Sequence, residues 1–288
     1  MLNNNTFYKV FVLCQYLLFL VKLCTPKFAI YVIGDSISYR IYRFGIAPTF
    51  NCTLEDQLIT RPVEKIEYNG SFGDYSTNKG WKCFSGTVSR VGFAFNWGVS
   101  NVDGDYEIAY LKHRSPGDTN NSISNIMSAV DEFQARSDNE EEVIFLFSSN
   151  LWDVHRYQST YHSKPDTYTW LQQYRKNYTS VILQICDKMR PIDKLILQTT
   201  HHIKSIDSMR VPSSLLNDEI SKISSFFQLP LFDTRLFIQD NNMHLADHDN
   251  VHQKQETSIV YAKQIGLKNW TNLNGLCNSS HNKSHYLH

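Results

Sequence analysis

Short and almost wholly apolar runs recur along this chain, and each stops at glycine or at polar residues. The first run spans residues 28–33 and ends at Gly34, and further runs occupy 143–147, 195–199 and 231–233. Their short length and their β-branched and aromatic residues favour buried strands over helices. Strands that are apolar on both faces are typical of a parallel sheet that is covered on each side.

Segments with helical spacing separate these runs. Four of them place apolar residues three and four positions apart, over 122–136, 168–189, 213–227 and 254–267. A shorter helical pattern follows the first strand, at Ile37, Ile41 and Phe44. Strands that alternate with helices predict an α/β domain over residues 28–270, built as a three-layer α/β/α sandwich around a parallel sheet.

Residues 52–117 differ from the rest of the chain. They are rich in Gly, Asn, Ser, Tyr and Trp, and residues 88–95 alternate between apolar and polar positions. This composition predicts short strands and long loops rather than helices. We interpret the segment as a strand-rich insertion that elaborates the sheet, and not as a separate domain.

The first residues of the chain predict export, and the last residues predict a disordered tail. Lys9 precedes an apolar run over residues 10–21, which has the length of a signal-peptide core and is short for a membrane span. Residues 1–25 are therefore expected to be a signal peptide, with a retained signal anchor as the alternative. Residues 271–288, rich in Asn, Ser and His, are expected to be a disordered tail.

Glycosylation signals and cysteines agree with a secretory location. Asn-x-Ser/Thr acceptors begin at Asn4, Asn51, Asn69, Asn120, Asn177, Asn269, Asn278 and Asn282. If Cys14 and Cys24 leave with the signal, the remaining cysteines form an even set that suits two disulfides, in one of three pairings. These are Cys52, Cys83, Cys186 and Cys277. Buried free thiols and unused acceptors are the alternative.

Composition sets limits on the possible partners. The chain of 288 residues has 28 basic and 28 acidic side chains, so its formal net charge is zero and gives no sign of nucleic acid or of an anionic membrane as a partner. Hydrophobic residues make up 42% and aromatic residues 13%, which is enough for a substantial core and argues against global disorder.

Two short motifs near opposite ends of the chain carry a serine and an Asp–His pair. Gly34-Asp35-Ser36 closes the first strand, so Ser36 should lie at a strand-to-helix turn on the carboxyl edge of the sheet, where α/β proteins place their ligands. Asp249-x-x-His252 precedes the closing helix. In this order and context, the two motifs resemble the first and last blocks of the SGNH, or GDSL, hydrolase superfamily.

The resemblance implies a catalytic triad and an oxyanion hole. Ser36 would be the nucleophile and His252 its general base, with Asp249 orienting the imidazole. The oxyanion would rest on the Ser36 N–H, on the Asn150 side chain and on the N–H of Asn101. Asn150 follows the strand at 143–147, while Asn101 closes a segment, 96–101, that resembles the second block of the superfamily but ends in asparagine instead of glycine.

A third segment narrows the resemblance. Leu151-Trp152-Asp153, followed by Arg156-Tyr157, resembles the PC-esterase branch of the superfamily. That branch implies a serine esterase that needs no metal or cofactor and acts on acyl groups of carbohydrates or other modified surface molecules. An acyltransferase would use the same residues, and a catalytically silent carbohydrate-binding relative would keep the fold. Trp152 and Asp153 have a purely structural interpretation as well, a corner in which the ring packs and the carboxylate binds backbone or Arg156.

Histidines offer a rival chemistry. His244, His248 and His252 recur every four residues and would share one face of a helix, where they could bind zinc beside Asp249. The many Asp and Asn residues in this stretch favour turns over a helix and argue against such a site. His201 and His202 follow the strand at 195–199 and could contact a substrate, with an ordinary loop as the alternative.

Overall fold

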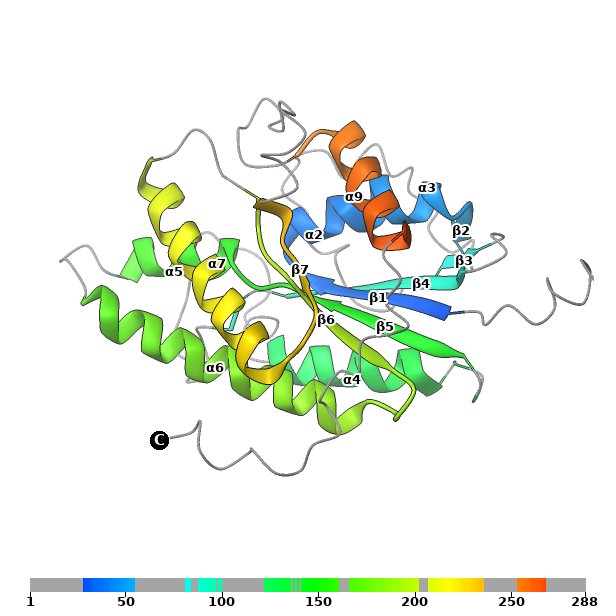
Figure 1. Ribbon diagram of the computed structural model, residues 1–288, viewed down its shortest axis with the longest axis horizontal. Coiled ribbons are helices and arrows are strands. Elements are labelled where there is room, and N and C mark those ends of the chain that lie inside the picture. Colours follow the sequence, from blue (N-terminus) through cyan, green and yellow to red (C-terminus); the bar gives the residue numbers. More distant parts are fainter. Residues whose placement is uncertain are drawn as a thin grey trace, which may run out of the picture.

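A seven-stranded sheet between two layers of helices forms the centre of the structure (Figure 1). This computed structural model describes residues 28–54, 81–83, 88–96, 98–99, 122–135, 137, 139, 141–160, 166–201, 207–235 and 253–267. The predicted signal segment at 1–25 and the predicted tail at 271–288 lie outside these residues. The three-layer α/β/α sandwich expected from the sequence is confirmed.

Five strands of the sheet run parallel. They are β4 (Val88–Phe95), β1 (Phe28–Gly34), β5 (Glu142–Phe147), β6 (Lys194–Gln198) and β7 (Leu231–Phe232), in this spatial order. Two short strands, β3 (Trp81–Cys83) and β2 (Cys52–Leu54), extend the sheet beside β4 in antiparallel fashion. The segment interpreted as an insertion therefore also contributes β4, a neighbour of the central strand.

Helices cover both faces of this sheet (Figure 1). One layer contains α2 (Ser36–Arg40), which continues without a break through the π-helical turns of η1 (Ile41–Ile46) into α3 (Ala47–Thr49), and α9 (Gln255–Leu267). The opposite layer contains α4 (Ser122–Ala135), α6 (Thr167–Lys188) and α7 (Asp207–Phe227). A further helix, α5 (Leu151–Thr160), follows β5 directly and contacts α7.

Strand β1 shows why the apolar runs are continuous. Its alternate residues point to opposite faces, so Tyr31 and Ile33 belong to the core under α4, α6 and α7, while Ile30 and Val32 belong to the core under η1 and α9. All four side chains are buried. Each contributes about 1.5–3 kcal/mol by leaving water, and a polar residue at any of them would face a core.

The strand order creates a natural site at the end of β1. The chain passes from β1 to β4 on one side and then to β5 on the other, so the order of the parallel strands reverses at β1. The crevice beyond the carboxyl ends at such a switch point is where open α/β sheets bind ligands. Register pairs Gly34 with Phe95 and Ile33 with Phe147, so these strands end on one edge of the sheet. We call this edge the carboxyl rim.

Two helices differ from the sequence prediction. Helix α5 is not expected from the sequence, and α7 begins at Asp207 rather than at 213. Pro212 lies inside α7. A proline lacks the N–H that a helix interior uses, which is why the sequence favours a start after it; in α7, Pro212 leaves the second turn one hydrogen bond short.

The covalent and surface features support part of the export prediction. Cys52 and Cys83 form a disulfide across β2 and β3, and Cys186 is also disulfide-bonded. Asn51 is exposed, whereas Asn177 is buried in α6 and is therefore not an accessible acceptor in the folded chain. Among the helices within the described ranges, none combines the length and apolar character needed to cross a membrane.

Candidate active site

Ser36 is the first residue of α2, immediately beyond the carboxyl end of β1. Asp35 caps this helix, because its Oδ1 accepts hydrogen bonds from the N–H groups of Ile37 at 2.9 Å and Ser38 at 3.3 Å. A helix start carries a partial positive charge from its aligned peptide dipoles. The predicted nucleophile therefore lies where negative charge on a reacting group would be stabilised.

Gly34 allows this turn to be tight. A Cβ at Gly34 would overlap the Cβ and Oγ of Ser38, because α2 folds back against the end of β1. Ser148, at the end of β5, lies on the other side at 3.5 Å from the same point. Glycine is thus required for the strand to end directly beneath the helix that carries Ser36.

The carboxylate of Asp35 joins the Ser36 turn to α5. Its second oxygen, Oδ2, accepts a hydrogen bond from the N–H of Leu151 at 3.2 Å, and the residue is only 1% exposed. Leu151 is the first residue of α5. A single buried carboxylate therefore caps two helices that begin at neighbouring strand ends.

The turn after β4 lies against the Ser36 turn. Asn96 donates its backbone N–H to the carbonyl of Gly34 at 2.8 Å and its side-chain amide to the carbonyl of Ser148 at 3.0 Å. Its Oδ1 accepts a hydrogen bond from Gly98, whose φ of 99° places it in the left-handed region. Asn96 thus starts a turn directly after β4, and Asn101, the predicted oxyanion donor, lies outside the described residues.

Asn150 lies on the carboxyl rim at the end of β5, but its side chain is turned toward α7. Its amide nitrogen donates to the carbonyl oxygen of Ser213 at 3.0 Å and to Oδ1 of Asn217 at 2.9 Å. Its own carbonyl oxygen accepts from the Ser213 hydroxyl at 2.9 Å. Both amide hydrogens are thus used in joining β5 to α7, and the oxyanion role of Asn150 stays a prediction.

Trp152 and Asp153 have structural roles of the kind considered from the sequence. The Trp152 ring is buried in the core under α9. Asp153 is completely buried, and its carboxylate accepts from the Val99 N–H at 2.8 Å and from the Ser149 hydroxyl at 2.5 Å. It therefore binds backbone of the turn after β4.

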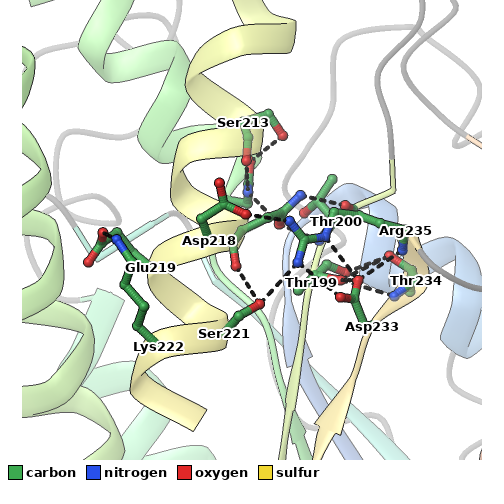
Figure 2. A network of polar contacts seen from close by, with 12 residues as sticks. Thr199, Thr200, Ser213, Asp218, Glu219, Ser221, Lys222, Asp233, Thr234 and Arg235 are labelled. Atoms are coloured by element: carbon green, nitrogen blue, oxygen red, sulfur yellow. Dashed lines mark hydrogen bonds and ion pairs between the residues drawn. The ribbon is translucent and has the colours of Figure 1, made fainter. Parts of the chain in front are cut away.

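A polar network fixes the other half of the rim to α7 (Figure 2). Asn217 in α7 accepts from the N–H of Thr200 at 2.9 Å and donates to its carbonyl oxygen at 2.7 Å, which ties down the end of β6. Beyond β7, Arg235 binds Asp233 at 2.9 Å and Asp218 of α7 at 2.7 Å. These hydrogen bonds and ion pairs fix the ends of β6 and β7 to α7.

Asp233 makes this network sensitive to acid. Burial disfavours its charge, but hydrogen bonds from Arg235 and Thr199 outweigh burial and hold the pKa of Asp233 below its usual value. A lowered carboxyl pKa stabilises the fold above the unfolded-state value of about 3.9, and this contribution is lost as pH falls through the folded-state pKa.

We therefore expect Asp233→Asn to lower the free energy of unfolding by about 1–2 kcal/mol at pH 7, because a charge-assisted hydrogen-bond network is weakened. Below the folded-state pKa of Asp233 the difference from the parent should shrink. Urea denaturation at pH 7 and at progressively lower pH measures both values. Asp131→Asn, on a half-exposed ion pair, is the matched control and should change stability by less than about 1 kcal/mol at either pH. An equal deficit for Asp233→Asn at every pH would contradict this assignment.

The motif Asp249-x-x-His252 ends directly before Gln253, the first described residue of the closing segment. Asp249 and His252 lie outside the described residues, but Gln253 is fully buried and donates its side-chain amide to the carbonyl oxygen of Ile37 at 2.9 Å. Residues adjacent to Ser36 and to His252 are therefore in direct contact. The sequence pattern does not single out Gln253, because this contact joins residues 216 positions apart.

Close packing of α9 on η1 also holds the start of α9 beside the helical run that begins at Ser36. A Cβ at Gly45 would lie 2.7 Å from the Ser258 carbonyl carbon and closer still to its oxygen. Gly45 thus allows the first turns of α9 to lie directly on the helical run that begins at Ser36. The chain that follows His252 is thus held against this helical run by Gln253 and by the packing of α9.

The structure describes only one of the histidines that were considered as zinc ligands or substrate contacts. His244, His248 and His252 lie outside the described residues, as does His202. His201 is buried at the end of β6. Within the ranges that the structure covers, no group of three or more His, Cys, Asp or Glu side chains is placed to hold a metal ion.

Comparison with known proteins finds similar structures but no matching sequence. Neither a protein-family model nor a curated protein matches the chain. A lipolytic protein of the G-D-S-L family from Veillonella parvula is 14% identical, with a TM-score of 0.42 over 85% of this chain and 100% of that one. The acetyl xylan esterase AlAXEase is 15% identical, with a TM-score of 0.44 over 83% and 98%. An arylesterase-like protein from Agrobacterium tumefaciens is 12% identical, with a TM-score of 0.44 over 83% of this chain and 96% of that one.

Proposed function

We propose that this protein is a serine esterase of the SGNH type. One observation carries the proposal: Gln253 binds Ile37, so the residue after His252 contacts the residue after Ser36 at the carboxyl rim. Consecutive Cα atoms are about 3.8 Å apart, which keeps His252 within one chain step of that contact. A general base must come within hydrogen-bond reach of its nucleophile, and this arrangement favours it.

The proposed reaction has two steps. Ser36 Oγ attacks the ester carbonyl while His252 takes its proton, and Asp249 stabilises the imidazolium that forms. The negative oxygen rests on the N–H groups of Ser36 and Asn101 and on the Asn150 amide, which would exchange one of its hydrogen bonds to α7 for the oxyanion. His252 then protonates the departing alcohol, and water releases the acyl group from Ser36 by the reverse sequence.

We extend the proposal to acyl groups on carbohydrates or other modified surface molecules. Its support is the resemblance of the segments around Trp152 and His252 to the PC-esterase branch. A secretory location agrees with such substrates, and the Cys52–Cys83 disulfide supports it, because disulfides persist in oxidising compartments. A glycan hydroxyl in place of water would make the same site an acyltransferase.

Turnover of defined esters tests the function. The purified protein is assayed with p-nitrophenyl acetate and with acetylated xylan oligosaccharides, with and without a chelator, beside Ser36→Ala. We expect acetate release that ignores the chelator and disappears in the variant. Activity that survives Ser36→Ala and is abolished by the chelator would replace this proposal with the zinc alternative, and no hydrolysis by the folded protein would refute it. Acetyl transfer to an added glycan, measured against release to water, distinguishes the transferase.

A further inference from the structure

The first turn of α5 contacts both turns from which the proposed site is built. Leu151 donates its N–H to Asp35, the cap of the Ser36 helix, at 3.2 Å. One helical turn spans Leu151 and Asp153, and Asp153 accepts from the N–H of Val99 in the turn after β4 at 2.8 Å. The start of α5 therefore connects the Ser36 turn to the turn after β4 through two buried carboxylates.

The turn after β4 is held at both of its described ends. At its start, Asn96 is bonded to the carbonyl oxygens of Gly34 and Ser148. At Val99 the contact comes from Asp153. Without Asp153 the first end would still be fixed by the sheet, whereas the end that leads toward Asn101 would lose its hydrogen bond to α5.

The surroundings of Asp153 keep its geometry fixed. Its second oxygen accepts from the Ser149 hydroxyl at 2.5 Å, and the Ser149 carbonyl accepts from the hydroxyl of Tyr174. Burial raises the pKa of Tyr174, and the negative charge of nearby Asp153 raises it further. Burial and the charge of Asp153 also raise the pKa of Tyr178, so both phenols keep their protons at neutral pH. The carboxylate thus lies in a packed environment with defined hydrogen-bond partners.

We infer that Asp153 is a positioning residue, which holds Val99, and with it the described turn after β4, beside the Ser36 turn where the proposed reaction develops its oxyanion. The inference rests on the proposed function and adds to it a residue that does not touch substrate. A donor that acts only on the developing oxyanion stabilises the transition state more than the bound ester. Its misplacement should therefore lower kcat and leave KM nearly unchanged.

Three variants separate positioning from general stability. Asp153→Ala removes both acceptor oxygens and should lower kcat by about 10²–10³-fold, the effect of losing one oxyanion donor, with KM within about threefold of the parent. Asp153→Asn keeps an oxygen for the Val99 N–H, and Ser149→Ala keeps the whole carboxylate, so each should stay within about tenfold. Asp131→Ala, on a half-exposed side chain of α4, is the control. The pH profile of kcat/KM should not shift in any of them.

Amide hydrogen exchange gives a readout that does not depend on activity. In Asp153→Ala the Val99 amide should exchange at least tenfold faster, while amides of β1 keep their protection. Unchanged protection at Val99 would overturn the inference whatever the kinetics show. An active parent whose Asp153→Ala variant keeps its kcat would overturn the inference and leave the proposed esterase standing. An inactive parent in which Val99 still depends on Asp153 would refute the esterase, and with it the catalytic meaning of the contact.

Discussion

Replacing Ser36 with alanine is expected to lower kcat/KM for ester hydrolysis by about 10⁴-fold or more, because the covalent route through the serine is lost. Stability should change little, since the hydroxyl is small and Asp35 still caps α2 through Ile37 and Ser38. Steady-state kinetics on p-nitrophenyl acetate and thermal unfolding measure the two effects. Ser225→Ala, on an exposed residue of α7 whose hydroxyl binds its own helix, is the matched control and should keep full activity.

The same loss is expected for His252→Ala, and the two losses should not add. Nucleophile and base act as one unit, so the double variant should be about as slow as either single variant. Multiplied losses in the double variant would mean that Ser36 and His252 work independently, against the proposed triad.

Replacing Gly45 with alanine is expected to lower both stability and activity. The new methyl group would meet the backbone of Ser258, which cannot move aside by changing a rotamer, so α9 must shift. Overpacking of this kind costs about 1–3 kcal/mol, more than the ~1 kcal/mol that alanine gains over glycine in a helix. Because α9 directly follows Gln253 and His252, a shift of about 1 Å should also lower kcat about 10²-fold. Chemical denaturation and kinetics per labelled active site measure these effects.

Gly92→Ala is the comparison that separates the loss of kcat from the loss of stability. A Cβ there would lie 2.6 Å from ring atoms of Tyr31 and Phe133, so it too should destabilise the protein. These rings lie in the core under α4 and not beside α9. The folded fraction of Gly92→Ala should therefore keep its kcat. Equal losses of kcat in both variants would mean that Gly45 contributes only to stability.

The layered fold is predictable from the sequence because the polarity of the residues in each strand indicates whether both faces of that strand are buried. The run around Tyr31 is apolar at every position, and this has one simple explanation, a parallel strand with helices on both faces. Strand β4 was harder to place, because Arg90 and other polar residues interrupt it. In the structure Arg90 is paired with Glu141, which allows the polar residue within the parallel sheet.

The candidate site was predictable in position more than in detail. Ser36 and Asn150 both lie on the carboxyl rim because strand ends follow directly from the apolar runs. The direction of the Asn150 amide depends on Ser213 and Asn217, which lie 63 and 67 positions away, and no local pattern reveals such partners. Asp153 and Gln253 likewise act through residues distant in the chain. Long-range hydrogen bonds decide these orientations. Their partners lie far apart in the chain, so no periodic pattern of residues in a single sequence reveals them.

Covalent labelling with a fluorophosphonate probe, followed by peptide mapping, tests the central claim most directly. The account predicts a single modified peptide that carries the probe on Ser36, with labelling lost in Ser36→Ala, slowed strongly in His252→Ala and unaffected by a chelator. Labelling at another residue, or none in a folded parent that is disulfide-bonded at Cys52 and Cys83, would contradict it.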